Sequence, residues 1–433
     1  MKKLILPVFL LCFGFIASAQ ESKTSFFLDH NVYSYRINPA AEFDEKPYTF
    51  FALGLGNTSA SLLSNLGASS LLYPTVDGLV WGLDDAISTD TFLSKFAKDN
   101  IILPQASVNI LSFGHQGEKG RFNVEVNLKS DNYFYASKDV FAAAKDGLYT
   151  GLKTKIGTWA FQNMNVSTSS LVEVAAGYAH KIGDMVTVGG TAKMLLGVAG
   201  GALDFNSFHL TSSDGDNFYG SADAKLLLSS TLFKIGTQNV GGKNLYDFSS
   251  FQFNKVGLAG VGFGLDLGVT VEPVEGLTLG LSALDLGFIK WNSAVNGKIE
   301  YSNKKIDVVE DALELQVADP SNETRMLNYN IHLSAKYRMP FYDRLSVGLL
   351  GTYQKYFKEA RLGVDITPVR PISIAISGAY NNFGFDFGAA LNVRIPGINL
   401  FLALDSIYFD MTPQFLPVSR GITNATVGLA IAF

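Results

Sequence analysis

Residues 423–433 read Thr-Asn-Ala-Thr-Val-Gly-Leu-Ala-Ile-Ala-Phe, and the larger apolar side chains fall at every second position. Successive side chains of a β-strand point to opposite faces, so this segment has one apolar face and one face of small or polar groups. A strand of a membrane-embedded barrel needs this pattern, with apolar groups toward lipid and small or polar groups toward the lumen. The stretch therefore predicts a spanning β-strand that ends on the aromatic Phe433.

The opposite end of the sequence predicts export. Met1-Lys2-Lys3 is positively charged, residues 4–16 are almost wholly apolar, and Ala17-Ser18-Ala19 fits a cleavage site. This pattern is typical of a secretory signal peptide over residues 1–19, and its apolar run is too short to span a bilayer. Cys12, the single cysteine, lies in that run, so the exported chain is expected to hold no disulfide.

The composition favours a membrane barrel over a multidomain enzyme. Charged residues make up 17% of the 433 residues, below the roughly 25% of soluble domains, while aromatics reach 12% and glycines number 42. No run of about 18 apolar residues follows residue 20, which excludes helical membrane spans. Loss of Lys2 and Lys3 moves the formal net charge from −5 to −7, and this acidity argues against a nucleic-acid partner.

Two-residue periodicity predicts fourteen spanning strands. In the clearest one, Leu327–Met339, odd positions read Leu, Tyr, Ile, Leu, Ala, Tyr, Met and even positions are polar. The other thirteen ranges are 48–57, 105–113, 121–129, 170–182, 184–196, 257–272, 276–291, 345–357, 359–367, 372–380, 383–394, 399–410 and 420–433. Short turns join many of them, as an antiparallel meander requires, with residues 48–57 expected beside the final strand.

Four long links are expected on the outer side of the membrane: 58–104, 130–169, 197–256 and 292–326. Residues 137–149 and 84–98 are amphipathic and predict short helices within these links. Residues 203–231 predict a strand pair around Asp214-Gly215-Asp216-Asn217. The fold prediction is therefore an all-β, antiparallel transmembrane barrel of about 14 strands over residues 48–433, a monomer in the outer membrane of a Gram-negative bacterium, surrounded by outer-membrane lipid. Phe433 is expected to engage the barrel-assembly machinery.

Residues 20–47 are expected to form a hatch inside the barrel. A lumen of about fourteen strands is too wide for its own wall side chains to fill. The segment contains aromatic side chains that would be buried by folding inward, namely Phe26, Phe27, Tyr33 and Tyr35. A disordered periplasmic tail is the alternative.

Polar residues on the predicted lumen face of Leu327–Met339 are candidate ligand contacts: Asn328, Asn330, His332, Lys336 and Arg338. Such residues also solvate a lumen or anchor a hatch. The glycines of residues 260–264 are expected to form a lumen-facing stripe that allows close approach of a hatch or ligand, not a phosphate loop. No histidine has metal-ligand spacing and no nucleophile elbow is present, so we expect no metal, no cofactor and no enzyme activity.

Arg36-Ile37-Asn38-Pro39-Ala40-Ala41 resembles the Asn-Pro-Ala element in the N-terminal segment of the long-chain fatty-acid transporter family of outer-membrane barrels. Residues 285–291, 137–141 and 110–114 resemble an uncharacterised family of outer-membrane proteins from Gram-negative gut and environmental bacteria. These resemblances imply a transporter-like barrel with Asn38, Pro39 and Ala40 as a hatch motif.

The function expected from these features is passive transport of small hydrophobic compounds across the outer membrane, and the hydrophobic cargo is implied by the resemblance alone. A second hypothesis is a non-transporting barrel that anchors or receives secreted surface proteins. A third, a barrel hydrolase, would depend on His332 beside a Ser or Thr nucleophile at the membrane edge.

Overall fold

The computed structural model describes residues 21–29, 31–42, 47–54, 56–76, 78–145, 156–292, 295–306, 314–319, 322–406 and 421–433. The predicted signal peptide lies outside these residues. In this described part of the chain, no helix is both long and apolar enough to cross a membrane.

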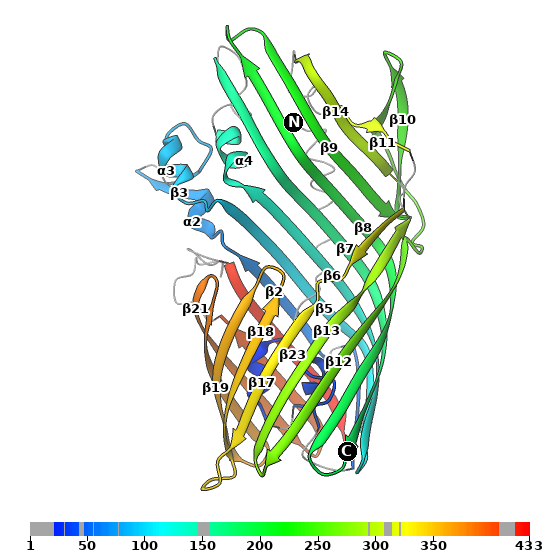
Figure 1. Cartoon of the computed structure of the whole chain (residues 1–433), viewed down its shortest axis with the longest axis vertical. Helices are drawn as coiled ribbons and strands as arrows, with labels where there is room; N and C mark the ends of the chain where they lie inside the picture. Colours follow the sequence, from blue (N-terminus) through cyan, green and yellow to red (C-terminus); the bar gives the residue numbers. More distant parts are fainter. Residues whose placement is uncertain are drawn as a thin grey trace.

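The described residues form a closed antiparallel barrel, which confirms the predicted fold class (Figure 1). The barrel wall has fourteen strand positions, which we call staves, and each stave is one strand or two successive strands in line. Closure is made by Phe50 of β1 opposite Ala432 of β23, the pairing expected from the sequence. In order around the barrel, the staves are β1 (Tyr48–Leu53) with β2 (Thr58–Ser64), β5 (Asp99–Gln116), β6 (Gly120–Ser137), β7 (Gly157–Ile182), β8 (Val186–Ser212), β12 (Gly260–Val274), β13 (Leu277–Asn292), β16 (Asn322–Met326) with β17 (Asn330–Arg338), β18 (Leu345–Gln354), β19 (Lys358–Val369), β20 (Ile372–Asn381), β21 (Gly384–Ile395), β22 (Gly397–Asp405) and β23 (Gly421–Ala432).

Two staves are interrupted, and this corrects two predicted ranges. The predicted strand Leu327–Met339 starts instead at Asn330, because Leu327 turns inward, donates its N–H to Gly287 O at 2.9 Å and packs near Trp291. The first stave continues past its predicted end, since β2, placed in a loop by the sequence, pairs with both β23 and β5.

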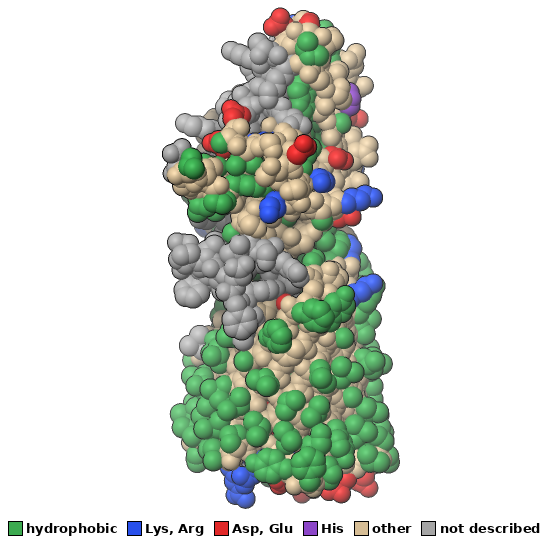
Figure 2. Space-filling model, turned by 90° about the vertical axis from the view of Figure 1, so that its left-hand side faces the viewer, with side chains coloured by type: hydrophobic (Ala, Val, Ile, Leu, Met, Phe, Trp, Pro, Cys, Tyr) green, Lys and Arg blue, Asp and Glu red, His purple; other side chains and the backbone are tan. Residues whose placement is uncertain are grey.

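Apolar side chains cover the outside of the barrel and polar ones line its inside. In β23, Leu429 and Ile431 are exposed while Asn424 and Thr426 are buried, as the alternation predicts. Figure 2 shows hydrophobic side chains over the lower part of the molecule, with charged side chains above it and at the lower rim. An apolar exterior around a polar interior is stable only where lipid surrounds it.

The two ends of the barrel differ. At the end that we call the turn end, short connections join the staves at residues 117–119, 183–185, 275–276, 339–344, 370–371 and 396. At the opposite loop end, the longer connections emerge together with two tight ones at 355–357 and 382–383. The long links therefore all lie at one end of the barrel, as expected from the sequence.

A tall sheet rises from the loop end on one side (Figure 1). β7 and β8 have 26 and 27 residues, and β9 (Phe218–Ser230) and β14 (Val295–Ile306) extend the sheet. Residues 157–169 and 197–202, predicted as links, are therefore strand, whereas the pair around Asp214 is confirmed. β10 (Phe233–Val240), β11 (Lys243–Phe253) and β15 (Gln316–Val317) complete this outer extension, whose own apolar core includes Phe208 and Leu210.

A small lobe also lies at the loop end. It comprises α2 (Ala68–Leu71), β3 (Leu72–Thr75), β4 (Gly78–Trp81) and α3 (Thr89–Leu93), and it packs Phe96 against Phe141 of α4 (Lys138–Ala143). The predicted helices over 84–98 and 137–149 thus exist in shorter form, and residues 146–149 lie outside the described ones.

Candidate functional site

The described residues between 21 and 42, which we call the inserted segment, lie inside the barrel. Two short 3-10 helices, η1 (Lys23–Phe27) and η2 (Ser34–Arg36), fold this segment back on itself, as the dark blue turns of Figure 1 show. Its aromatic residues Phe27, Tyr33 and Tyr35 are fully or almost fully buried, in one apolar cluster with Phe50 of β1, Phe401 of β22 and Leu350 of β18. The wall therefore surrounds the segment.

The first anchor of the segment is a buried ion cluster. The Asp405 carboxylate accepts the backbone N–H groups of Lys23 at 2.7 Å and Thr24 at 2.9 Å. Arg361, with none of its surface exposed, lies 3.7 Å from that carboxylate and donates to Glu359 at 2.9 Å. Arg361 and Asp405 are both buried, so loss of either would leave the other as an uncompensated buried charge. Their contacts therefore fix the start of the segment to β19 and β22.

The second anchor is at Asp29. Lys336 Nζ lies 2.6 Å from the Asp29 carboxylate and donates to Phe27 O at 2.9 Å. Asn392 donates from the neighbouring side to Asp29 O at 3.1 Å. Lys336, one of the candidate ligand contacts, therefore holds the inserted segment, the alternative role named for these lumen residues.

The third anchor is the Asn38-Pro39-Ala40 motif. Asn38 Oδ1 accepts the N–H of Ala40 at 2.9 Å, which closes a tight turn, and Asn38 Nδ2 donates to Val269 O at 3.1 Å. Arg121 donates to Pro39 O at 2.7 Å. A Cβ at Gly268 would overlap Asn38 Oδ1, so a glycine at this position of β12 lets the motif touch the wall.

The glycines of residues 260–264 do not perform that role. A Cβ at Gly260 would meet Trp291, and one at Gly262 would overlap the backbone of β13. They permit close packing within the wall, while the inserted segment lies against Gly189, Gly268 and Gly280.

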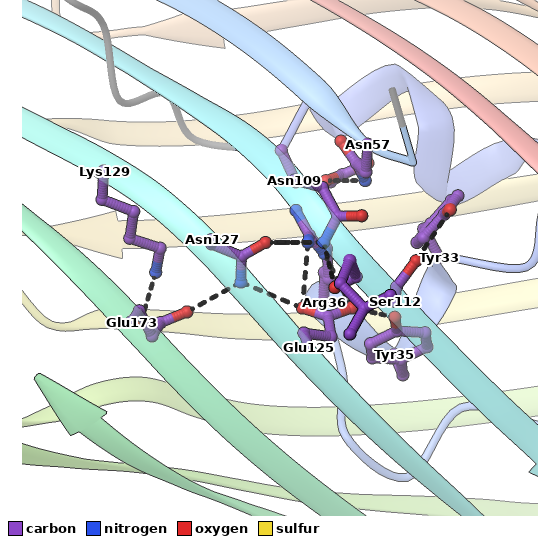
Figure 3. A network of polar contacts seen from close by, with 12 residues as sticks. Tyr33, Tyr35, Arg36, Asn57, Asn109, Ser112, Glu125, Asn127, Lys129 and Glu173 are labelled. Atoms are coloured by element: carbon purple, nitrogen blue, oxygen red, sulfur yellow. Dashed lines mark hydrogen bonds and ion pairs between the residues drawn. The ribbon is translucent and has the colours of Figure 1, made fainter. Parts of the chain in front are cut away.

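A polar network joins η2 to β6 and β7 (Figure 3). Arg36 pairs with Glu125 at 2.9 Å and donates to Asn127 at 2.7 Å, while the Tyr35 hydroxyl also donates to Glu125. Asn127 Nδ2 donates a hydrogen bond to Glu173 Oε1 at 3.1 Å. The segment and the wall above it thus share one continuous chain of hydrogen bonds.

That chain ends in a charged cavity of about 130 Å³ above the inserted segment. Lys193 lies 2.7 Å from Asp266 and 2.6 Å from Asp285, and Lys129 lies 2.7 Å from Glu173. At about 10–15 Å³ for each water, the cavity has room for roughly ten waters. Charged residues on its lining are Glu21, Lys23, Arg36, Glu125, Lys129, Asp131, Glu173, Lys193, Asp266 and Asp285.

The structure brings three of the five predicted ligand contacts to this cavity. Asn328, Asn330 and His332 line it, and His332 Nδ1 lies 3.1 Å from Thr352 Oγ1. Arg338 does not line it, because it is the last residue of β17, at the turn end, where its N–H donates to Gly276 O. The His332–Thr352 pair is buried in the lumen, away from the membrane edge that a lipid-cleaving barrel would use.

The charged residues of β6, β7, β8 and β12 were missed by sequence reasoning. Their signal is present in the alternation: residues 121, 123, 125, 127 and 129 read Arg, Asn, Glu, Asn, Lys between apolar neighbours. Their facing is predictable from period two, but the shortest ion pairs of Lys129 and Lys193 join positions 44 and 92 apart. Among the described residues, no group of three or more His, Cys, Asp or Glu is placed to hold a metal ion.

Residues 39–405 match the model of a protein family described as a family of unknown function, DUF5723. No curated protein matches the chain. Solved structures that resemble it include the TodX deltaS2S3 mutant monoaromatic hydrocarbon channel, at TM-score 0.47 and 11% identity over 96% of both chains. A Pseudomonas aeruginosa FadL homologue has TM-score 0.45 and 10% identity over 96% of both, and the Ralstonia pickettii toluene transporter TbuX has 0.42 and 11% over 91% of both.

Proposed function

The chain belongs to the family of unknown function DUF5723, and we propose that it is an outer-membrane channel of a Gram-negative bacterium, closed by residues 21–42 as a hatch. The apolar outside and polar inside of the barrel support a place in a bilayer. A closed wall of fourteen staves leaves the lumen as the path between the two ends, and the hatch occupies that path.

The observation that carries the proposal is how the hatch is held. Its anchors are hydrogen bonds and ion pairs, including those of Asp405, Lys336 and Arg121. Such polar contacts can be exchanged for water or solute, while the burial of Phe27, Tyr33 and Tyr35 favours the closed state. The segment is therefore suited to open and close.

The cavity favours small polar cargo. The resemblance implies small hydrophobic compounds, but charged side chains such as Lys193, Asp266 and Glu173 line the space above the hatch. An apolar molecule placed there would strip water from these charges and give them no partner in return. We propose that the cargo is a small polar compound. Comparing uptake of a labelled fatty acid with uptake of a labelled monosaccharide distinguishes the hydrophobic from the polar class of cargo.

A reversible lock tests the hatch. Thr24 Oγ1 lies 2.9 Å from Ser377 Oγ, so the double variant Thr24→Cys/Ser377→Cys places two sulfurs within reach of a disulfide. The single native cysteine, Cys12, lies in the predicted signal peptide. In proteoliposomes, the oxidised variant is expected to lose uptake of labelled glucose and to regain it on reduction.

The two single-cysteine variants are the controls, and oxidant should leave their uptake unchanged. Uptake that persists through the oxidised lock would show that the hatch need not move. Absence of uptake in every form, the reduced forms included, would contradict the proposed channel function.

The outer extension favours a second candidate, a barrel that anchors or receives secreted surface proteins. β10 and β11 form a hairpin at the loop end, and β10 pairs on one side with β11 among the described strands. A free strand edge can accept a strand from another protein. Deleting residues 233–253 should then remove a co-purifying surface protein without changing glucose uptake.

A further inference from the structure

Two carboxylates of the cavity lack the cations that their neighbours have. Glu173 is paired with Lys129, and Asp266 and Asp285 with Lys193. Among the described residues, Glu21 and Asp131 make no ion pair. Each carboxylate instead accepts a hydrogen bond from a neutral side-chain amide. Glu21 accepts one from Asn57 at 2.7 Å, and Asp131 accepts one from Gln105 at 2.8 Å.

The cationic side chains of the cavity are all engaged. Arg36 is held by Glu125, and Lys129 and Lys193 by the acids just named. Lys23 lies over the ring of Phe357, with Nζ 4.6 Å from its centre. Six carboxylates and four cations therefore line the cavity, so its lining carries an excess of negative charge.

Buried neutral groups on the same lining also lack protein partners. Both side-chain atoms of Asn123, which is 1% exposed, have no hydrogen-bond partner among the described residues, and neither does Ser107 Oγ. Asn330 Oδ1 is a fourth such atom. An unsatisfied buried polar group costs free energy, so these groups are suited to a molecule with hydroxyl groups.

From this lining we propose that the cavity binds small hydroxylated compounds that carry an ammonium group, of monosaccharide size or below. The negative charge of Glu21 and Asp131 attracts the ammonium, and the hydroxyl groups bond to Asn123, Ser107 and Asn330. The inference rests on the proposed channel function, because it names the class of solute that the channel takes. It excludes fatty acids and other anions, whose carboxylate would meet Glu21 and Asp131.

Three sugars of one ring size test the charge. Uptake of labelled glucosamine, glucose and glucuronate is compared in proteoliposomes holding the full chain, at neutral pH, where most of the glucosamine is protonated. Glucosamine is expected to enter about fivefold faster than glucose, the ratio that a single half-exposed ion pair supplies, and glucuronate slowest. The variant Glu21→Gln/Asp131→Asn keeps shape and removes charge, so it should bring the three rates together.

The variant Asp214→Asn, in the exposed β8–β9 turn far from the cavity, is the matched control and should keep the preference. Equal entry of the three sugars into wild-type liposomes, or a preference that survives the double variant, overturns the inference while leaving the channel proposal standing. Failure of all three to enter in any variant, including reduced Thr24→Cys/Ser377→Cys, overturns the channel proposal. Heat-dependent gel mobility confirms that each variant is folded.

Discussion

At the scale of single residues, Arg361 shows how much the hatch depends on one charge. It lies between Glu359 and Asp405, and Asp405 in turn holds the backbone of η1. Arg361→Ala would leave two buried carboxylates without a cation, a change that costs about 3–5 kcal/mol in buried pairs. We expect the folded form to convert to the unfolded gel band at a clearly lower temperature.

Arg344→Ala is the matched control, because Arg344 is exposed and makes one long hydrogen bond of 3.4 Å to a backbone carbonyl. An unchanged conversion temperature for Arg361→Ala would mean that the ion cluster contributes nothing to the closed state.

Gly268 tests the contact of the hatch motif with the wall. Gly268→Ala adds a Cβ where Asn38 Oδ1 now lies, an overpacking that costs about 1–3 kcal/mol. The Asn-Pro-Ala turn is expected to leave the wall, so trypsin should cut after Arg36 faster than in the wild type. Gly378→Ala, with nothing within 4 Å of the added Cβ, should behave like the wild type, and equal cleavage of both variants would contradict the role of Gly268.

The sequence predicted which side of the barrel wall a side chain faces, but not which residues that side chain contacts. Period two correctly placed His332 and Asn330 on the lumen side, because strand geometry is local. It could not show that Lys336 belongs to Asp29, since those residues are 307 apart and the contact exists only once the barrel has closed around the segment.

At the scale of elements, the predicted bounds of β23 agree closely with the observed ones, whereas those of β7 and β8 do not. Alternation identifies a strand but does not show where the bilayer stops, because the outer sheet, which β9 and β14 extend, also has a buried apolar face and keeps the same period. The interruption at residues 327–329 was missed for a similar reason, since their alternation continues while Leu327 packs inward.

The end of β23 carries a prediction about assembly. Phe433 is 75% exposed, and its backbone N–H and C=O bond to Thr49 at 2.9 and 2.8 Å. Phe433→Ala keeps those backbone bonds and removes the ring that we propose the assembly machinery binds. The amount of barrel in the outer membrane should fall severalfold, while barrel already assembled should unfold at the wild-type temperature; a normal yield would refute the proposed role.

At the scale of the whole molecule, the two largest apolar clusters of the described residues indicate two units of stability. One lies in the outer extension and includes Leu210, and the other lies inside the barrel and includes Tyr33. Leu210→Ala should destabilise its unit by about 2–5 kcal/mol. Hydrogen exchange should then rise in residues 203–230 and stay unchanged in β17–β23.

Tyr33→Ala is the reciprocal variant, and it should speed exchange in the inserted segment without affecting the outer extension. If either variant raised exchange in both regions equally, the molecule would behave as a single cooperative unit.

The contact between Ser22 and Thr426 joins positions 404 apart, and that between Lys23 and Asp405 joins positions 382 apart. Contacts of such separation form slowly, because the loop entropy must be lost before the contact is gained. The closed state is therefore a late event in the life of each molecule. Until then, unpaired strand edges and apolar faces remain open to other chains, so the time before closure is when this protein is most exposed to aggregation.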